Sequence, residues 1–248
     1  MAERLDGTVA LVTGASSGIG EATARALAEQ GARIALVARR KDRLDALAGE
    51  LDGALAIEAD VTDQAQAESA VEQTVRELGR LDTLVNNAGV MLLGPMLGAP
   101  TEEWDRMIQV NVQGLLYCAN AALPHLLRAA ESEPRRVADL VNVSSVAGRR
   151  AVRNAGVYNA TKFAVGALSE SLRQEVTARH VRVSLVEPGA VATELRDHLR
   201  PEVADVMPAP AFEVLESEDI ADAIAYIVTR PRRTAVNEIL IRPTEQEN

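Results

Sequence analysis

Short apolar runs alternate with longer segments of helical periodicity along almost the whole chain. Seven runs rich in valine, leucine, isoleucine and alanine predict strands: 8–13, 32–38, 54–59, 83–86, 138–144, 182–187 and 237–241. Between them, apolar residues at three- and four-residue spacing predict helices, including 21–31, 64–79, 104–128 and 157–179. Because the strands are apolar on both faces, the pattern predicts an α/β fold, with a doubly wound, seven-stranded parallel sheet and helices on both faces.

The sequence contains no internal repeat and no low-complexity linker, so we expect one domain over residues 1–248. One stretch departs from the regular alternation. From Glu194 to Pro210 the chain lacks clear periodicity and carries three prolines. We expect the segment around 194–215 to form a lid over a substrate site.

Charge and composition exclude several classes of partner. The chain has 26 basic and 36 acidic residues, a net charge of −10, and a pI near 4.9. Nucleic acids and anionic membranes bind clustered lysine and arginine, so we expect neither as a partner. No apolar run approaches the ~20 residues of a membrane span, and the N-terminus lacks the pattern of a secretory signal. We therefore expect a cytoplasmic protein.

The first predicted strand ends in TGASSGIG, residues 13–20, and a helix is expected to open at about Gly18. Glycines at such a junction permit a tight turn and let backbone N–H groups approach a pyrophosphate. The spacing is Gly-x3-Gly-x-Gly rather than the common Gly-x-Gly-x2-Gly, but the strand–turn–helix context is the required one. We predict a dinucleotide-binding turn made of Gly14, Ser16, Ser17, Gly18, Ile19 and Gly20.

The end of the second predicted strand indicates which dinucleotide binds. NAD-binding proteins usually hold the ribose 2′-hydroxyl with a carboxylate at this point, whereas this chain has Ala38 followed by Arg39, Arg40 and Lys41. Guanidinium groups suit a 2′-phosphate. The solvated start of a helix is the alternative interpretation of this stretch. We predict that the cofactor is NADP(H), favoured over NAD(H), and that Arg39 and Arg40 bind it.

Tyr158 and Lys162 lie four residues apart in the predicted helix 157–179, so they share one helical face. One interpretation is an ordinary amphipathic helix. The other is functional: a lysine ammonium one turn away, together with the positive nicotinamide ring of the oxidised cofactor, lowers the pKa of a tyrosine from its usual value near 10, which improves it as a general acid and base. The spacing alone does not choose between them.

Further motifs follow in a fixed order, and the set resembles the short-chain dehydrogenase/reductase family over essentially the whole chain. They are the turn 13–20, an Asp-Val pair, the NNAG stretch 86–89, an asparagine in IQVNVQG, a serine in VSSVAG, Tyr158 with Lys162, and a Pro-Gly turn followed by a threonine. The resemblance implies a Rossmann fold and an NADP-dependent enzyme. It adds to the cofactor site Asp60, Val61, Asn87, Ala88, Gly89, Tyr158, Lys162, Pro188, Gly189, Val191 and Thr193.

The resemblance also implies four catalytic residues and their roles. Tyr158 exchanges a proton with the substrate oxygen, and Ser145 holds and polarises that oxygen. Lys162 binds the nicotinamide ribose as well as acting on Tyr158. Asn111 holds a water that links Lys162 to solvent. In the family the serine stands thirteen residues before the tyrosine, which selects Ser145 over Ser144.

The reaction implied is hydride transfer between nicotinamide and the carbonyl, or the primary or secondary alcohol, of a small to medium, partly apolar substrate: a carbonyl reductase or alcohol dehydrogenase. An idle dinucleotide-binding regulator and a family epimerase or dehydratase are the alternatives; the four retained catalytic residues disfavour the first. The stretches MLLGP, LRQEV and IRPTEQ are similar to those of the clavulanic-aldehyde reductase branch. The three histidines lie on different elements, so we expect no metal site.

Assembly is predicted from the helices that carry the catalytic residues. In the stretch GLLYCANAALPHLL, leucine and alanine occur nearly all round the helix, which predicts burial on two sides. Family members pair these helices across a two-fold axis, so we expect a homo-oligomer, either a dimer or a homotetramer. A helix that is rich in alanine for propensity alone is the other interpretation.

Overall fold

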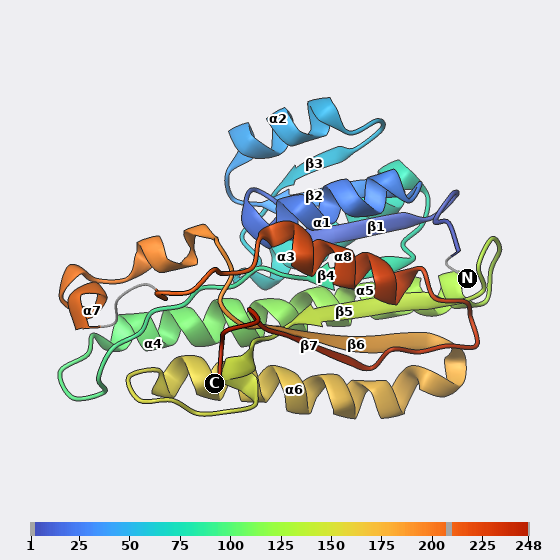
Figure 1. The fold of residues 1–248 in the computed structure, drawn as a ribbon. Helices are drawn as coiled ribbons and strands as arrows, with labels where there is room; N and C mark the ends of the chain where they lie inside the picture. Colours follow the sequence, from blue (N-terminus) through green and yellow to red (C-terminus); the bar gives the residue numbers. More distant parts are fainter. Residues whose placement is uncertain (1–2, 207–209, 248) are drawn as a thin grey trace.

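The computed structural model describes residues 3–206 and 210–247. Its seven strands form one parallel sheet in the order β3-β2-β1-β4-β5-β6-β7, drawn in Figure 1. They are β1 (Val9–Thr13), β2 (Arg33–Ala38), β3 (Leu55–Glu58), β4 (Thr83–Asn86), β5 (Ala138–Val143), β6 (Val181–Pro188) and β7 (Glu238–Ile241). The predicted doubly wound parallel sheet is confirmed, and each strand begins and ends within one residue of its predicted bounds.

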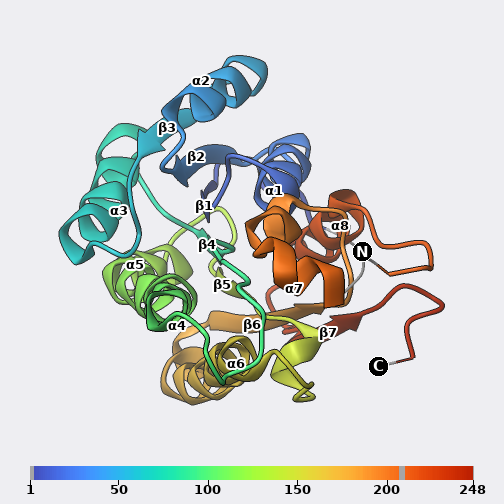
Figure 2. The same cartoon turned by 90° about the vertical axis from the view of Figure 1, so that its left-hand side faces the viewer.

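Helices cover both faces of the sheet, as Figure 2 shows from one end. The first layer contains α1 (Gly18–Glu29), α2 (Lys41–Glu50) and α8 (Ser217–Val228), and the second contains α3 (Gln64–Leu78), α5 (Leu115–Ala130) and α6 (Gly156–Val176). Within the layers, α1 packs on α8 and α3 packs on α5. None of the described helices is both long enough and apolar enough to cross a membrane.

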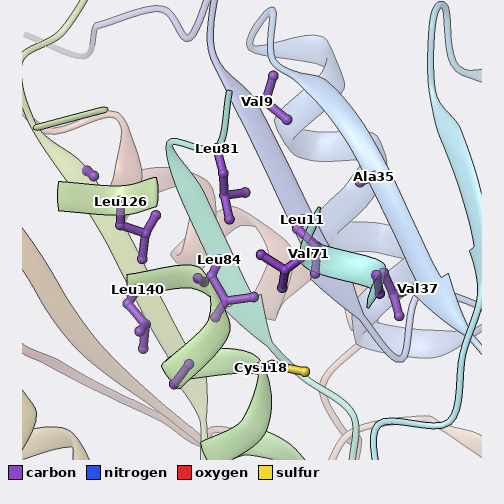
Figure 3. Close-up of a cluster of buried hydrophobic side chains, with 14 of the residues drawn as sticks. Val9, Leu11, Ala35, Val37, Val71, Leu81, Leu84, Cys118, Leu126 and Leu140 are labelled. Carbon is purple, nitrogen blue, oxygen red and sulfur yellow. The ribbon is translucent and has the colours of Figure 1, made fainter. Parts of the chain in front are cut away.

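The core is divided by the sheet because successive side chains of a strand point to opposite faces. Val9 and Leu11 of β1 pack in the cluster beneath α3 and α5, part of which is drawn in Figure 3. Ala10 and Val12 pack in the cluster beneath α1 and α8. The single cysteine, Cys118, is buried in the first cluster, and burial raises the pKa of its thiol to about 12, so it is an inert packing residue.

The predicted helix 104–128 is divided in the structure. It consists of α4 (Thr101–Ile108), a π-helical turn (η1, Gln109–Gly114) and α5, which follow one another without a break. A Cβ atom on Gly114 would lie 2.9 Å from Cγ2 of Val61, so the absence of a side chain lets the turn pack closely on the loop after β3. Such π-turns are frequent at functional sites, and this one contains Asn111.

The segment predicted as a lid contains short helical elements. A 3-10 helix (η4, Glu194–His198) is followed by α7 (Pro201–Val206), and residues 207–209 of the predicted lid lie outside the described residues. Val203 of α7 is buried in a small cluster with Leu92, Leu93 and Tyr158. The described part of this segment therefore shares an apolar cluster with the predicted catalytic tyrosine.

Candidate active site

The glycine-rich turn joins β1 to α1, which begins at Gly18. Gly14 has a φ of +66°, and a Cβ atom there would lie only 2.9 Å from the Cα atom of Ala88. Glycine is therefore required both for the left-handed backbone and for the close approach. The turn exposes the N-terminus of α1, whose free N–H groups and dipole favour an anion.

Thr13 and Asn87 tie this turn to the loop after β4. The hydroxyl of Thr13 accepts hydrogen bonds from the backbone N–H groups of Asn87 (3.0 Å) and Ala88 (3.1 Å). The side-chain amide of Asn87 donates in return to the carbonyl oxygens of Thr13 (3.0 Å) and Gly14 (3.3 Å). Hydrogen bonds thus hold together two loops that are more than 70 residues apart in sequence.

A pocket of about 280 Å³ lies against these two loops, at the carboxyl ends of the strands. Parallel α/β sheets bind ligands at this edge, next to the point where the strand order reverses. Thirteen of the predicted cofactor residues line the pocket: Gly14, Ser16, Ser17, Gly18, Ile19, Arg39, Arg40, Asp60, Val61, Asn87, Ala88, Gly89 and Thr193. The predicted residues outside its lining are Gly20, Tyr158, Lys162, Pro188, Gly189 and Val191.

The predicted phosphate ligands stand in different environments at the edge of the pocket. Arg39 is exposed, and within the described chain its guanidinium has no ion-pair or hydrogen-bond partner. Arg40 lies over the glycine-rich turn and donates to the hydroxyls of Ser16 (3.0 Å) and Ser17 (2.7 Å). Its remaining contact is an ion pair with Glu194, at 2.8 Å.

Tyr158 and Lys162 share one face of α6, as predicted, and both are buried. The Nζ atom of Lys162 lies 5.9 Å from the centre of the Tyr158 ring and donates to the carbonyl oxygen of Val143 at 3.0 Å. Burial raises the pKa of Tyr158 to about 12, although a hydrogen bond with Ser145 acts toward a lower pKa. Burial also lowers the pKa of Lys162 to about 8.

The prediction for Tyr158 combined two charges, the Lys162 ammonium and the nicotinamide ring of the oxidised cofactor. In the protein without cofactor the pKa of Tyr158 is raised, so the lowering by both charges stays a prediction. The physical reason for the raised pKa is desolvation, which disfavours the phenolate, while the ammonium of Lys162 is directed at the carbonyl oxygen of Val143.

Asn111 is fixed by three hydrogen bonds in the π-helical turn. Its Oδ1 atom accepts from the N–H of Val90 (2.8 Å), and its Nδ2 atom donates to the carbonyl of Val90 (2.9 Å) and to the hydroxyl of Thr161 (3.1 Å). Gly89, which lines the pocket, is close to both Asn111 and Lys162. A Cβ atom on Gly89 would lie 3.5 Å from Oδ1 of Asn111 and 3.9 Å from Nζ of Lys162. Asn111 and Lys162 therefore adjoin the inner end of the pocket.

The two candidate serines have different partners. Ser144 is buried and donates to the carbonyl oxygen of Lys162 at 3.1 Å, so it joins β5 to α6. Ser145 begins the next 3-10 turn, where its hydroxyl accepts from the N–H of Ala147 (3.1 Å) and donates weakly to the carbonyl of Pro188 (3.4 Å). The long second bond leaves the Ser145 hydroxyl available to another oxygen.

Several pocket residues were not predicted as cofactor ligands. Val90, Arg106 and Val110 are three of them, and Glu194, Leu195 and His198 lie in the segment that was predicted only as a lid. Glu194 directly follows the predicted Thr193, and its charge opposite the arginine-rich stretch 39–43 is the one signal that could have indicated it. Arg106 and His198 carry no such signal. Among the residues that the structure describes, no group of three or more His, Cys, Asp and Glu side chains could hold a metal ion.

Comparisons with known proteins agree with this geometry. The family model described as short chain dehydrogenase matches residues 8–204. An uncharacterized oxidoreductase of Staphylococcus aureus is 36% identical over 237 residues, covering 95% of this chain and 96% of its own. The closed form of a serine dehydrogenase complexed with NADP+ has a TM-score of 0.89 at 31% identity, with 97% of each chain covered.

A further similar structure contains the other nicotinamide cofactor. It is a 3-ketoacyl-(acyl-carrier-protein) reductase from Brucella melitensis complexed with NADH, with a TM-score of 0.85 and 32% identity over 96% of this chain and 97% of that one. None of these three proteins carries the name of a clavulanic-aldehyde reductase, so the resemblance to that branch stays a prediction.

Proposed function

The chain belongs to the short-chain dehydrogenase family, and from this premise we propose that it transfers a hydride between NADP(H) and a carbonyl or alcohol carbon, with Tyr158 as general acid and base. One observation carries the proposal. The Ser145 hydroxyl lies near enough to the Tyr158 phenol to act on its pKa, while Lys162 and Asn111 adjoin the pocket that the predicted cofactor residues line.

The residues present fit the cofactor. The N-terminus of α1 and the turn at Gly14 would receive the pyrophosphate, and Arg39 offers an unpaired cation for a 2′-phosphate. Asp60 and Val61 would flank the adenine, and Lys162 would hold the nicotinamide ribose. When bound, the cofactor supplies or accepts the hydride.

The chain's own residues then handle the proton. In reduction, the Tyr158 hydroxyl gives its proton to the carbonyl oxygen, and the Ser145 hydroxyl donates a hydrogen bond to the same oxygen. A pKa near 12 keeps Tyr158 protonated at neutral pH, which is the form that reduction requires. Lys162, with a pKa of about 8, still carries its proton at neutral pH and can favour the phenolate that forms.

Replacing Arg39 with alanine should narrow a preference for NADPH over NADH. Because Arg39 is exposed, solvent screening limits its contact with a 2′-phosphate, and we expect KM for NADPH to rise about fivefold to tenfold. KM for NADH should change little. Steady-state kinetics with both cofactors test this, and NADH being the better cofactor of the wild-type enzyme would contradict it.

Lys41→Ala is the matched control for Arg39→Ala. It removes a positive charge two residues away, but Lys41 pairs with Asp45 and does not line the pocket. An equal rise of KM for NADPH in both variants would mean that the general charge of the helix start matters rather than a contact of Arg39.

The substrate class is proposed from the surroundings of Tyr158, which are mostly apolar: Val90, Leu92, Leu93, Met107 and Val203. They support a small to medium, partly apolar carbonyl compound or alcohol. A panel of aldehydes, ketones and their alcohols, with serine included because a similar structure is a serine dehydrogenase, tests the proposal. The absorbance of the reduced cofactor would report turnover, and no turnover across the panel with either cofactor would count against it.

A homo-oligomer is part of the proposal. Apolar residues are exposed on α4, α5 and α6. The exposed fractions of Ile108, Leu116 and Phe163 are 42%, 40% and 45%, and Ala167 of α6 is also exposed. Leu116→Glu or Ala167→Glu should therefore reduce both assembly and activity. Light scattering at micromolar concentration measures assembly, and a wild-type monomer of 26.5 kDa would contradict the prediction. Leu97→Glu is a control, because Leu97 is 94% exposed in a loop outside these helices.

We also propose that the chain acts in the cytoplasm as one domain, with the segment 194–215 as a lid over the substrate.

A further inference from the structure

The carboxylate of Glu194 lies at the edge of the cofactor pocket, where it pairs with both Arg40 and Arg43. Its Oε2 atom lies 2.8 Å from NH1 of Arg40, and its Oε1 atom lies 2.7 Å from NH1 of Arg43. These two ion pairs lower the pKa of Glu194 to about 2, so it is charged at every ordinary pH. Both arginines come from the stretch after β2, whereas Glu194 lies about 150 residues later in the chain.

Three of the five N–H donors of Arg40 are already engaged within the protein. Its Nε and NH2 atoms are used by Ser16 and Ser17, and its NH1 atom by Glu194. A phosphate bound by Arg40 would stand beside the Glu194 carboxylate, and two like charges on one guanidinium repel each other. The 2′-phosphate and Glu194 thus compete for the same cation.

The same carboxylate anchors the segment whose Val203 is buried in one cluster with Tyr158. Glu194 is the first residue of η4, which leads into α7 and the buried Val203. A second ion pair holds that segment farther along, with Nε of Arg200 2.8 Å from Oε1 of Glu103 on α4. Loss of the Glu194 contacts would release the end of the segment nearest the cofactor pocket.

We propose that Glu194 is a specificity-determining residue that occupies the anion site of Arg40 and Arg43 and must yield it to the 2′-phosphate of NADP(H). The inference rests on the proposed function, since it assumes that the pocket binds a nicotinamide dinucleotide. It assigns Arg43 to the phosphate site together with Arg39 and Arg40. It also makes Glu194 an internal competitor that opposes the phosphorylated cofactor and spares NAD(H), which carries a neutral 2′-hydroxyl there in place of the phosphate.

Cofactor dissociation constants of the free enzyme test the proposal without turnover. Titration with NADPH and with NADH, followed by the fluorescence of the reduced nicotinamide, gives both constants for the wild-type protein and for Glu194→Gln. Because the two ion pairs are about 40% exposed, we expect the variant to bind NADPH about threefold to tenfold more tightly and NADH within about twofold of wild type. Glu202→Gln is the control, because it removes the same charge from an exposed ion pair in the same segment.

The outcomes are distinguishable. Unchanged or weaker binding of NADPH by Glu194→Gln would overturn the inference, because Glu194 would then be a neutral or stabilising neighbour of the phosphate. An equal gain for both cofactors, or an equal gain in Glu202→Gln, would overturn it as well. Wild-type protein that binds neither cofactor would instead refute the proposed function. A gain for NADPH alone supports the proposal, and Glu194→Asp, which keeps the charge, should then show less of it.

Discussion

Replacing Tyr158 with phenylalanine should reduce kcat by about a thousandfold and leave cofactor binding nearly unchanged. General acid–base catalysis by a positioned side chain contributes about 10²–10⁴ in rate, and the substitution removes only the phenolic hydroxyl. The ring would still pack against Leu92, Leu93 and Val203. We therefore expect the variant to fold and to keep the shape of the substrate site.

Two measurements separate a catalytic from a structural effect of Tyr158→Phe. NADPH fluorescence titration should give a dissociation constant within about twofold of wild type, while turnover on the best substrate of the panel collapses. Tyr117→Phe is the matched control, because Tyr117 of α5 is a partly buried tyrosine that packs in the core away from the pocket. Turnover of Tyr158→Phe within about tenfold of wild type would contradict the role of this residue.

The sheet was predicted well because each of its strands is marked by a pattern of neighbouring residues. Each strand is a short apolar run bounded by polar or glycine residues, and a doubly wound sheet needs little more than the alternation of such runs with helices. The glycine-rich turn was recognisable for the same reason, since Gly14, Gly18 and the following helix are contiguous.

Features that depend on contacts distant in sequence were not predictable in this way. The apolar pattern of residues 104–128 predicts one helix, but a π-helical turn around Asn111 interrupts it. The close packing of Gly114 on Val61 is a contact between distant segments that only the folded structure shows. The raised pKa of Tyr158 comes from burial, which residue spacing does not contain. Glu194 reaches Arg40 and Arg43 only after the chain has folded.

A buried ion pair is the clearest case of such a hidden contact. Asp139 of β5 and Arg182 of β6 are paired in the parallel register, and both are almost fully buried. Two nitrogens of Arg182 donate to the two carboxylate oxygens of Asp139 at 2.7 and 2.8 Å. The remaining donors of Arg182 bond to carbonyl oxygens, including those of Val228 and Arg230, and so join the sheet to the end of α8.

Asp139→Asn should therefore cost about 3–5 kcal/mol of unfolding free energy, because it leaves the buried guanidinium of Arg182 without its counter-charge. The asparagine is nearly isosteric, so the loss reports charge rather than volume. Urea denaturation at one fixed protein concentration measures the change. Glu170→Gln breaks the exposed ion pair of Glu170 with Arg173 and should cost less than about 0.5 kcal/mol. Equal denaturation midpoints for the two variants would contradict the argument, because the difference in burial is what separates the two ion pairs.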